Sequence, residues 1–324
     1  MNKIETLKQQ IDELVAEEKM FASYKARYNL AQSYFEINDY HSSLKEAELL
    51  STIARKTDNH GLLVRLALLQ VKCYFLLQDY QKAKAAMVVT ASTALTIYCP
   101  PILQGEIDAY QGMLTIAESD PLTAFSFLTE SFENFKNTDK TKAHGVFLLM
   151  ALCKLLSGHY DEVKALINSK NGSMFSTDES VLAMAKCSEV VSENDLFTFK
   201  QIFLSEALWK TGFMEAAYFI HKEMTELSDK ILEDHIVSTL KCYHSISLSH
   251  LCSQIGIPDE EFVNNFVTSL IIDGKLSAKI SQSEGYLHMK KVSKYNGTLL
   301  MNARDVLENL EKKTLQYENL ILSK

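Results

Sequence analysis

Turn-forming residues are scarce in this sequence of 324 residues, which contains only 4 prolines and 11 glycines. A β-rich or α/β protein of this length needs many tight turns, and these two residues supply most of them. The scarcity therefore favours long helices. The apolar content of 47% lies well above that of disordered chains. A mostly α fold is predicted.

Long apolar runs are also missing. No stretch of about 18 uninterrupted apolar residues is present, so no membrane-spanning helix is predicted. Met1 to Lys19 carry charges of both signs and lack the apolar core of a secretion signal. The cysteines have no disulfide-like spacing and are expected to be reduced: Cys73, Cys99, Cys153, Cys187, Cys242 and Cys252. These features predict a location in cytoplasm and nucleus.

Positive charge is in short supply, because the formal net charge is −8. Nucleic-acid binding needs a cationic surface to displace counterions, so bulk nucleic-acid binding is disfavoured. Signatures of catalysis are missing too: there is no phosphate-binding glycine loop, no Gly-x-Ser-x-Gly elbow and no His-Glu-x-x-His helix. No enzyme activity and no cofactor are predicted.

Four residues form a possible zinc quartet, Cys242-x-His244 and His250-x-Cys252. His250 and Cys252 are two positions apart in an expected helix, so their side chains point about 200° apart. Zinc ligands must instead turn toward one metal ion. Ordinary core and surface roles are the favoured interpretation, and no metal site is predicted.

A repeat with a period of 40 residues organises the first half of the chain. Residues 30–35 with Asp39-Tyr40 recur as residues 70–75 with Asp79-Tyr80. Each aspartate is expected to cap the helix that follows, and each tyrosine to fill the gap between paired helices. The pattern predicts a right-handed solenoid of helical hairpins (TPR-like) over residues 1–195. A coincidental amphipathic pattern is the alternative, but the recurrence of Tyr-Phe and Asp-Tyr weighs against it.

The helical pattern stops after Leu240, and shorter elements follow. Residues 243–247 are expected to form a strand and 248–255 a helix; a second helix opens at Pro258, with the proline in its first turn. Two short strands at 276–281 and 286–290 are joined by a hairpin connection. This order is that of a winged helix. Residues 196–294 are therefore predicted to form one domain, with a helical part at 196–240 and a winged helix at 241–294.

The second helix of this winged helix would enter the major groove if the domain bound DNA. It carries Asp259, Glu260 and Glu261 and has no lysine or arginine up to Ile272. Phosphates repel these carboxylates, and no cationic side chain is available to contact guanine. Protein contact is therefore favoured over nucleic acid.

A heptad pattern occupies residues 295–324. The seam positions follow one another at spacings of three and four, and all but Thr314 are apolar or aromatic: Leu300, Ala303, Leu307, Leu310, Thr314, Tyr317 and Ile321. Such a seam predicts a long C-terminal helix that packs on other helices. Little of this chain remains to cover the seam, so partner helices are favoured. Folding back onto the chain's own domain is the alternative.

Helical repeats followed by a winged helix resemble the PCI-domain family, named after the proteasome lid, the COP9 signalosome and translation initiation factor 3. Residues 97–104, 123–133 and 246–274 and the wing turn at 282–285 are similar to the proteasome lid family called non-ATPase regulatory subunit 11. The paralogous family of signalosome subunit 2 shares the 123–133 motif but lacks the Tyr-Cys-Pro-Pro stretch. The similarity begins near Tyr28, and family members have a longer solenoid, so a shortened N-terminus is expected.

The resemblance implies a non-catalytic scaffold subunit of the 26S proteasome lid, which holds lid, base and core particle together for ubiquitin-dependent protein degradation. The implied partners are other PCI subunits, the lid helical bundle, the ATPase base and core-particle α subunits, with no nucleic acid and no membrane. Contacts to the bundle would come from Leu300, Ala303, Leu307, Leu310, Tyr317 and Ile321. Contacts through the winged-helix edge would come from Tyr286, Leu287, His288 and Met289. A COP9 signalosome PCI scaffold and an RNA-associated PCI protein of a translation-initiation or mRNA-export complex are the alternatives.

Overall fold

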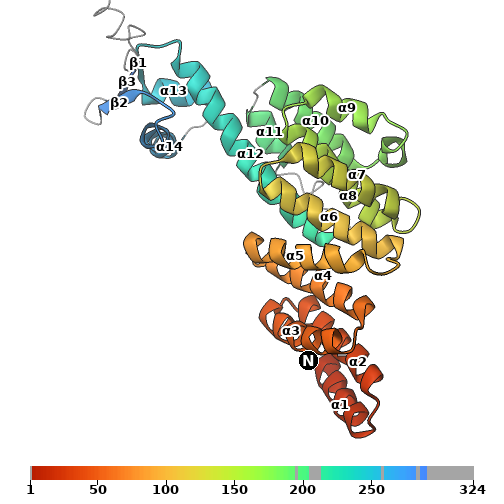
Figure 1. Ribbon diagram of the computed structural model, residues 1–324. Coiled ribbons are helices and arrows are strands. Elements are labelled where there is room, and N and C mark those ends of the chain that lie inside the picture. The colour runs from red at the N-terminus through yellow and green to blue at the C-terminus, as the bar shows by residue number, and fades with distance from the viewer. Residues whose placement is uncertain (1, 194–195, 204–212, 257–258, 282–284, 290–324) are drawn as a thin grey trace, which may run out of the picture. The chain divides into compact units, whose positions relative to one another are not determined.

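The computed structural model describes residues 2–193, 196–203, 213–256, 259–281 and 285–289 (Figure 1). The chain divides into two compact units, of which the first ends at Ile231 and the second begins at Leu232. Helix α12 (Met214–Leu240) contributes residues to both units. Within the described ranges, no helix combines the length and the apolar character that crossing a membrane requires.

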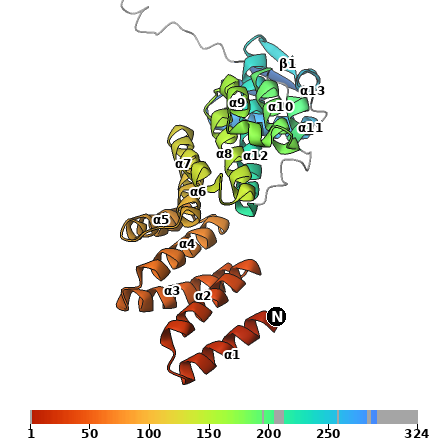
Figure 2. The same cartoon turned by 90° about the vertical axis from the view of Figure 1, so that its right-hand side faces the viewer.

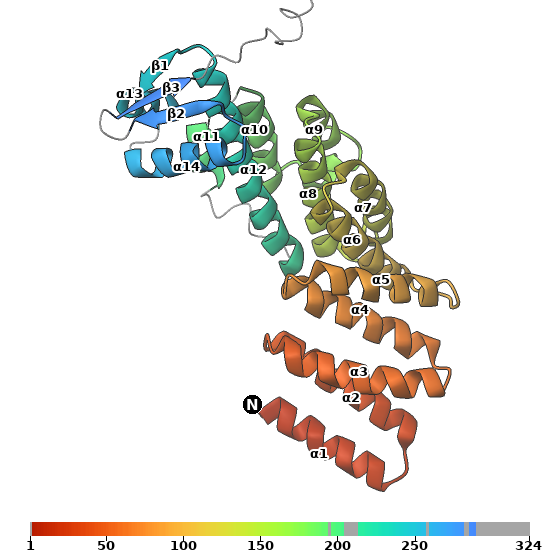
Figure 3. The same cartoon turned by 60° about the vertical axis from the view of Figure 1, so that its left-hand side comes forward.

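The first unit is built almost entirely from helices that run back and forth. They are α1 (Asn2–Ala16), α2 (Met20–Glu36), α3 (Tyr40–Lys56), α4 (His60–Leu76), α5 (Tyr80–Ala94), α6 (Pro101–Ala117), α7 (Pro121–Phe135), α8 (Lys140–Leu156), α9 (Tyr160–Ile167), the 3₁₀ helix η1 (Gly172–Phe175), α10 (Glu179–Glu193) and α11 (Leu196–Phe203). Helices that follow one another pack as hairpins, and the hairpins stack in layers (Figure 3). The predicted helical solenoid is confirmed.

Alternate helices of this stack also touch. Helix α2 contacts α4, α4 contacts α6, and α6 contacts α8, in addition to their sequence neighbours. Together these four helices form one side of the stack, which we call the even-helix face. The side view in Figure 2 shows the succession of the layers from α1 to α7.

The turns between the first helices repeat as strictly as the helices. A residue with positive φ recurs every 20 positions, at Glu18, Asn38, Asp58 and Gln78. The next residue is the N-cap of the following helix. The carboxylate of Asp39 accepts a hydrogen bond from the Ser42 backbone N–H at 3.2 Å, and that of Asp79 accepts one from Lys82 at the same distance. Both predicted aspartate caps are confirmed.

The tyrosine of each Asp-Tyr pair packs against a phenylalanine in the last turn of the preceding helix. The ring centroids of Phe35 and Tyr40 are 5.7 Å apart, and those of Phe75 and Tyr80 are also 5.7 Å apart. Both pairs are tilted or edge-to-face, the arrangements that aromatic quadrupoles favour. The tyrosines therefore fill the gap between paired helices, as the repeat predicted.

Close backbone approach joins α6 to α7. The buried Ser131 hydroxyl of α7 donates a hydrogen bond to the Gly105 carbonyl oxygen of α6 at 2.7 Å. About two turns further along α6, a Cβ added at Gly112 would lie 2.7 Å from Cγ of Leu128. Leu128 is fully buried, so its side chain has no free space to move into.

Substituting Gly112→Ala is therefore expected to destabilise the first unit by about 1–3 kcal/mol, the usual cost of overpacking a filled core. The matched control is Gly61→Ala in the first turn of α4, where the nearest atom to an added Cβ is 3.9 Å away. That substitution should stabilise slightly, because alanine restricts the unfolded chain. Urea unfolding followed by circular dichroism measures both. Equal midpoints for the two variants would contradict the packing argument.

The second unit contains a small three-stranded sheet and two helices beyond the end of α12. Its elements are β1 (Ser245–Ser247), α13 (Leu248–Ile255), α14 (Glu260–Ile272), β2 (Ala278–Ser281) and β3 (Tyr286–Met289). The strands are antiparallel in the order β1-β3-β2, and Leu287 of β3 lies opposite both Ile246 and Ile280. The predicted order of strand, helix, helix and two strands is confirmed.

Helix α14 starts later than the sequence suggested. It begins at Glu260, and Asp259 is its N-cap, with a carboxylate that accepts hydrogen bonds from two backbone N–H groups at 3.1 Å. The expectation that Pro258 lies in the first turn is therefore wrong, and Pro258 itself lies outside the described residues. Asp259 marks the start of the helix because its carboxylate accepts hydrogen bonds from free backbone N–H groups of the first turn, and proline has no side-chain acceptor.

Candidate protein-interaction surfaces

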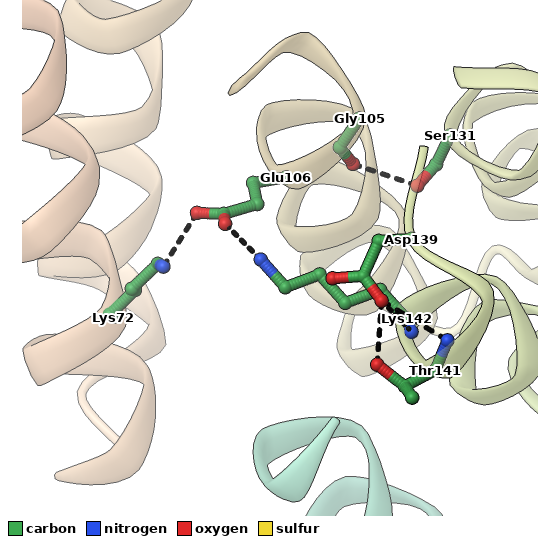
Figure 4. Close-up of polar contacts among 7 residues, drawn as sticks. All are labelled: Lys72, Gly105, Glu106, Ser131, Asp139, Thr141 and Lys142. Atoms are coloured by element: carbon green, nitrogen blue, oxygen red, sulfur yellow. Dashed lines mark hydrogen bonds and ion pairs between the residues drawn. The ribbon is translucent and has the colours of Figure 1, made fainter. Parts of the chain in front are cut away.

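A chain of three charges crosses the even-helix face from α4 through α6 to α8. Figure 4 shows the Glu106 carboxylate of α6 between Lys72 of α4 and Lys142 of α8. Lys72 Nζ donates to Glu106 at 2.6 Å, and Lys142 Nζ donates to the other carboxylate oxygen. The Glu106 side chain is only 14% exposed. Glu106 therefore links α4, α6 and α8 through one largely buried carboxylate.

The electrostatics of this cluster follow from its composition. Burial alone would raise the pKa of Glu106, but the neighbouring Lys72 and Lys142 outweigh it and hold that pKa below its ordinary value. Each lysine also lies over an aromatic ring, Lys72 at 5.6 Å from the Tyr110 centroid and Lys142 at 5.7 Å from that of Phe135. Each lysine ammonium group thus contacts both the Glu106 carboxylate and an aromatic ring. These contacts hold the helices together.

The first half of α12 packs on the turn between α4 and α5, about 140 residues earlier in the chain. The Gln78 amide donates to the Tyr218 hydroxyl at 2.6 Å, and Lys222 Nζ donates to the Tyr80 hydroxyl at 3.0 Å. The ring of Phe219 lies 5.3 Å from that of Phe75. The second Asp-Tyr turn therefore both closes its own hairpin and receives α12.

This contact between α12 and the second Asp-Tyr turn was not predicted from the sequence. The two Asp-Tyr turns look alike in sequence, yet it is the second whose Gln78 and Tyr80 hydrogen-bond to α12. One signal was present: Tyr218 and Phe219 stand beside Lys222 one turn away, which puts aromatic and cationic groups on the same part of α12. Neighbouring aromatic side chains on a helix surface indicate that another surface covers them.

A cavity of about 290 Å³ lies where α12 passes the turn between α6 and α7. Glu223 and Glu226 of α12 line it together with Pro121 of α7 and Leu156 of α8. Glu223 is 7% exposed. Burial, with a further contribution from Glu226, raises its pKa to about 7. This carboxyl group therefore changes charge near neutral pH.

The predicted winged-helix edge needs a correction. Tyr286, Leu287, His288 and Met289 form β3, which is the central strand of the sheet and not an edge. Its backbone is already paired with β1 on one side and with β2 on the other. The physical reason is that strand order is set by long-range pairing, which the local sequence pattern does not encode. Within the described sheet, β1 and β2 are the strands that could pair with a strand of a partner.

Side chains of the same strand nevertheless reach one surface of the sheet. Tyr286 and His288 are exposed and stack with ring centroids 6.3 Å apart, whereas Leu287 is fully buried. On α14, the core positions are Val263, Val267 and Leu270. Phe262 is exposed instead and stacks on Phe266 at 6.0 Å. Three of these four rings are exposed and Phe266 is half-buried, an arrangement that suits protein contact, and the acidic start of α14 disfavours phosphate.

Metal binding finds no support in the described part of the chain, where no group of three or more His, Cys, Asp or Glu is placed to hold an ion. Of the quartet considered from the sequence, Cys252 is buried while Cys242 is exposed. The heptad-seam residues predicted to bind partner helices lie outside the described residues: Leu300, Ala303, Leu307, Leu310, Tyr317 and Ile321.

Comparison with known families and proteins adds to this picture. Residues 211–291, from the approach to α12 to the end of the sheet, match the family model of the PCI domain. The chain carries a PCI domain. The PCI domain thus combines α12 with the strands and helices of the winged helix.

Curated proteins extend the similarity beyond the PCI domain into the solenoid. The chain is 29% identical to 26S proteasome non-ATPase regulatory subunit 11 of Dictyostelium discoideum, over 88% of this chain and 68% of that protein. It is 28% identical to the Arabidopsis thaliana homolog of that subunit, over 86% and 65%. It is 25% identical to 26S proteasome regulatory subunit RPN6 of Saccharomyces cerevisiae, over 87% and 65%. The predicted resemblance is confirmed, and the chain spans about two thirds of the length of these relatives.

Proposed function

We propose that this chain is a non-catalytic scaffold subunit of the 26S proteasome regulatory particle, which takes part in ubiquitin-dependent protein degradation. The observation that carries the proposal is the similarity to regulatory subunits of that name over 86–88% of the chain. The structure is compatible with a scaffold, since its polar clusters join helices to one another. We further propose that it acts in cytoplasm and nucleus.

The partners we propose are other PCI subunits, the helical bundle of the lid, the ATPase base and the α subunits of the core particle. β1 and β2 are the outer strands of the described sheet. An outer strand can pair with a strand of another chain where nothing else covers it. Edge-to-edge contact with a neighbouring PCI subunit would therefore use β1 or β2, with Tyr286 and His288 packing beside it.

Affinity purification of the tagged chain tests the proposal. Regulatory-particle and core-particle subunits should co-purify and be identified by mass spectrometry. Recovery of COP9 signalosome subunits alone would move the assignment to the signalosome. Recovery of translation-initiation or mRNA-export subunits, together with salt-sensitive RNA binding, would move it to an RNA-associated complex.

A double substitution on the heptad seam, Leu307→Asp with Leu310→Asp, should abolish co-purification with the assembly. Two carboxylates placed on an apolar seam cannot be buried against partner helices without a large desolvation cost. The matched control is Glu308→Asp with Glu311→Asp, which lies off the seam and keeps the charge. Circular dichroism checks that the solenoid is intact in both. Normal assembly of the leucine double variant would refute the bundle contact.

A further inference from the structure

Two neighbouring cavities lie between α2 and α4 on the even-helix face, and Tyr28 and Arg65 stand in the walls of both. Their volumes are about 190 and 290 Å³. Because Tyr28 and Arg65 belong to both, we describe the two cavities together as the α2–α4 groove. Pockets that enclose a whole drug-sized ligand measure about 300–1,000 Å³. The two cavities are smaller and suit single side chains of a larger partner.

The length of the groove follows from the helix that forms its wall. The lining residues of α2 run from Phe21 to Glu36 at spacings of three and four, so they form one stripe along the helix. At 1.5 Å per residue this stripe is roughly 22 Å long. An extended chain advances about 3.3 Å per residue, so about six or seven residues match the groove.

Aromatic rings line the end of the groove near the start of α2. Phe21 is 76% exposed and meets Tyr24 edge-to-face, with ring centroids 6.1 Å apart. Tyr28 continues the row one turn further on and is half-buried. Rings that lie in water next to apolar walls are the usual anchor points for a partner's side chains.

Charge distinguishes this end of the groove from the rest of the protein. The cavity around Phe21 is lined by the exposed cations Lys25 and Arg65, and none of its lining residues is acidic. The adjoining cavity has two acidic residues in its lining, Glu36 at the far end of α2 and Glu106, which pairs with Lys72 and Lys142. The whole chain has a net charge of −8, so a cationic, aromatic site stands against the overall charge. Such a site attracts a carboxylate.

We propose that the α2–α4 groove binds an extended segment of a partner protein in which acidic residues neighbour a large apolar side chain. A carboxylate of the segment lies between Lys25 and Arg65, and the apolar side chain lies on Phe21 and Tyr24. Arginine holds a carboxylate through two parallel hydrogen bonds, which gives the contact its direction. The proposal goes beyond membership in the proteasome particle and does not depend on it.

The test uses the full chain and fluorescein-labelled peptides of about seven residues, Asp-Glu-Phe-Asp-Glu-Asp-Gly and its relatives with leucine or tryptophan in place of phenylalanine. Fluorescence anisotropy gives the dissociation constants. Lys25→Glu with Arg65→Glu should weaken binding about 30-fold or more, since each cation contributes a charge-assisted contact. Phe21→Ser should weaken it about tenfold, and the fold is unaffected because this side chain is exposed.

The matched control is Lys45→Glu with Arg55→Glu on α3. It makes the same charge change at exposed positions outside the groove and should alter affinity by less than about twofold. Three outcomes overturn the proposal. One is the absence of binding of all these peptides up to about 1 mM. Another is equal binding of peptides with lysine in place of the acidic residues. The third is tighter binding of a single-stranded oligonucleotide that displaces the peptide.

Discussion

Replacing Glu106→Gln will destabilise the first unit by about 3 kcal/mol at neutral pH. The substitution keeps the shape of the side chain but removes the anion between Lys72 and Lys142. Those two side chains are only 20% and 26% exposed, so water replaces the lost carboxylate poorly. Breaking a buried ion pair by removing one partner is costly because the remaining charge stays uncompensated, and here two charges remain.

The matched control is Glu118→Gln. Glu118 also pairs with a lysine, Lys84, but both side chains are about half exposed. Exposed pairs contribute roughly 0–1 kcal/mol, so this variant should unfold close to wild type. Urea unfolding gives the two midpoints. Hydrogen exchange should rise in α4, α6 and α8 for the Glu106 variant alone. Equal losses in the two variants would show that the charge chain does not hold these helices.

Apolar replacement of the whole cluster should restore part of the lost stability. Glu106→Leu combined with Lys72→Met and Lys142→Met replaces the whole cluster by apolar side chains of similar length. It should be more stable than Glu106→Gln alone, because no buried charge is left unpaired. The stability difference between wild type and Glu106→Gln should also depend on pH. The pKa of Glu106 is lowered in the folded state, so its contribution is full above its ordinary pKa of about 4.5 and is lost as the pH falls below it.

The sequence predicted the parts of the fold that are set by neighbouring residues. The aspartate caps at positions 39 and 79, the tyrosine contacts and the bounds of α13 follow from local signals: a capping side chain, a helical apolar pattern, a glycine stop. Gly256, for example, ends α13 with a φ of 74°, which glycine adopts without steric cost. Local rules of this kind act within four or five residues and leave a readable pattern.

The rest depends on residues far apart in the chain. The ion contacts of Glu106 join positions 34 and 36 residues away, and Tyr218 bonds a residue 140 positions earlier. A lysine in a helix carries no sign of which carboxylate it will meet. Likewise, β3 reached the centre of its sheet by pairing with β1 across two helices, so its residues gave no local signal of their place. The candidate groove was missed for the same reason, since α2 and α4 each supply only half of it.

At neutral pH, ionisation of Glu223 should lower the free energy of unfolding of the first unit. Its pKa is about 7 in the folded state, chiefly because of burial, against an ordinary value of 4.5. A carboxyl group with a raised pKa holds its proton in the folded state where the unfolded chain has lost it. The contribution of Glu223 to stability is therefore neutral below about pH 4.5 and becomes unfavourable as the pH rises toward 7. Asp108, with a pKa of about 6, acts in the same direction at lower pH.

Glu223→Gln removes this ionisation and is expected to stabilise the first unit by about 2 kcal/mol at about pH 8, with no gain at about pH 4. The gain should develop between about pH 5 and 7. Asp108 also titrates in this range, but it is present in wild type and variant alike and cancels in their difference. Glu226→Gln is the matched control, because that neighbour on the same cavity is 62% exposed and should show no comparable gain. Unfolding midpoints across this pH range measure both variants. A pH-independent effect of Glu223→Gln would contradict this prediction. It would mean that burial does not raise the pKa of Glu223 into this range.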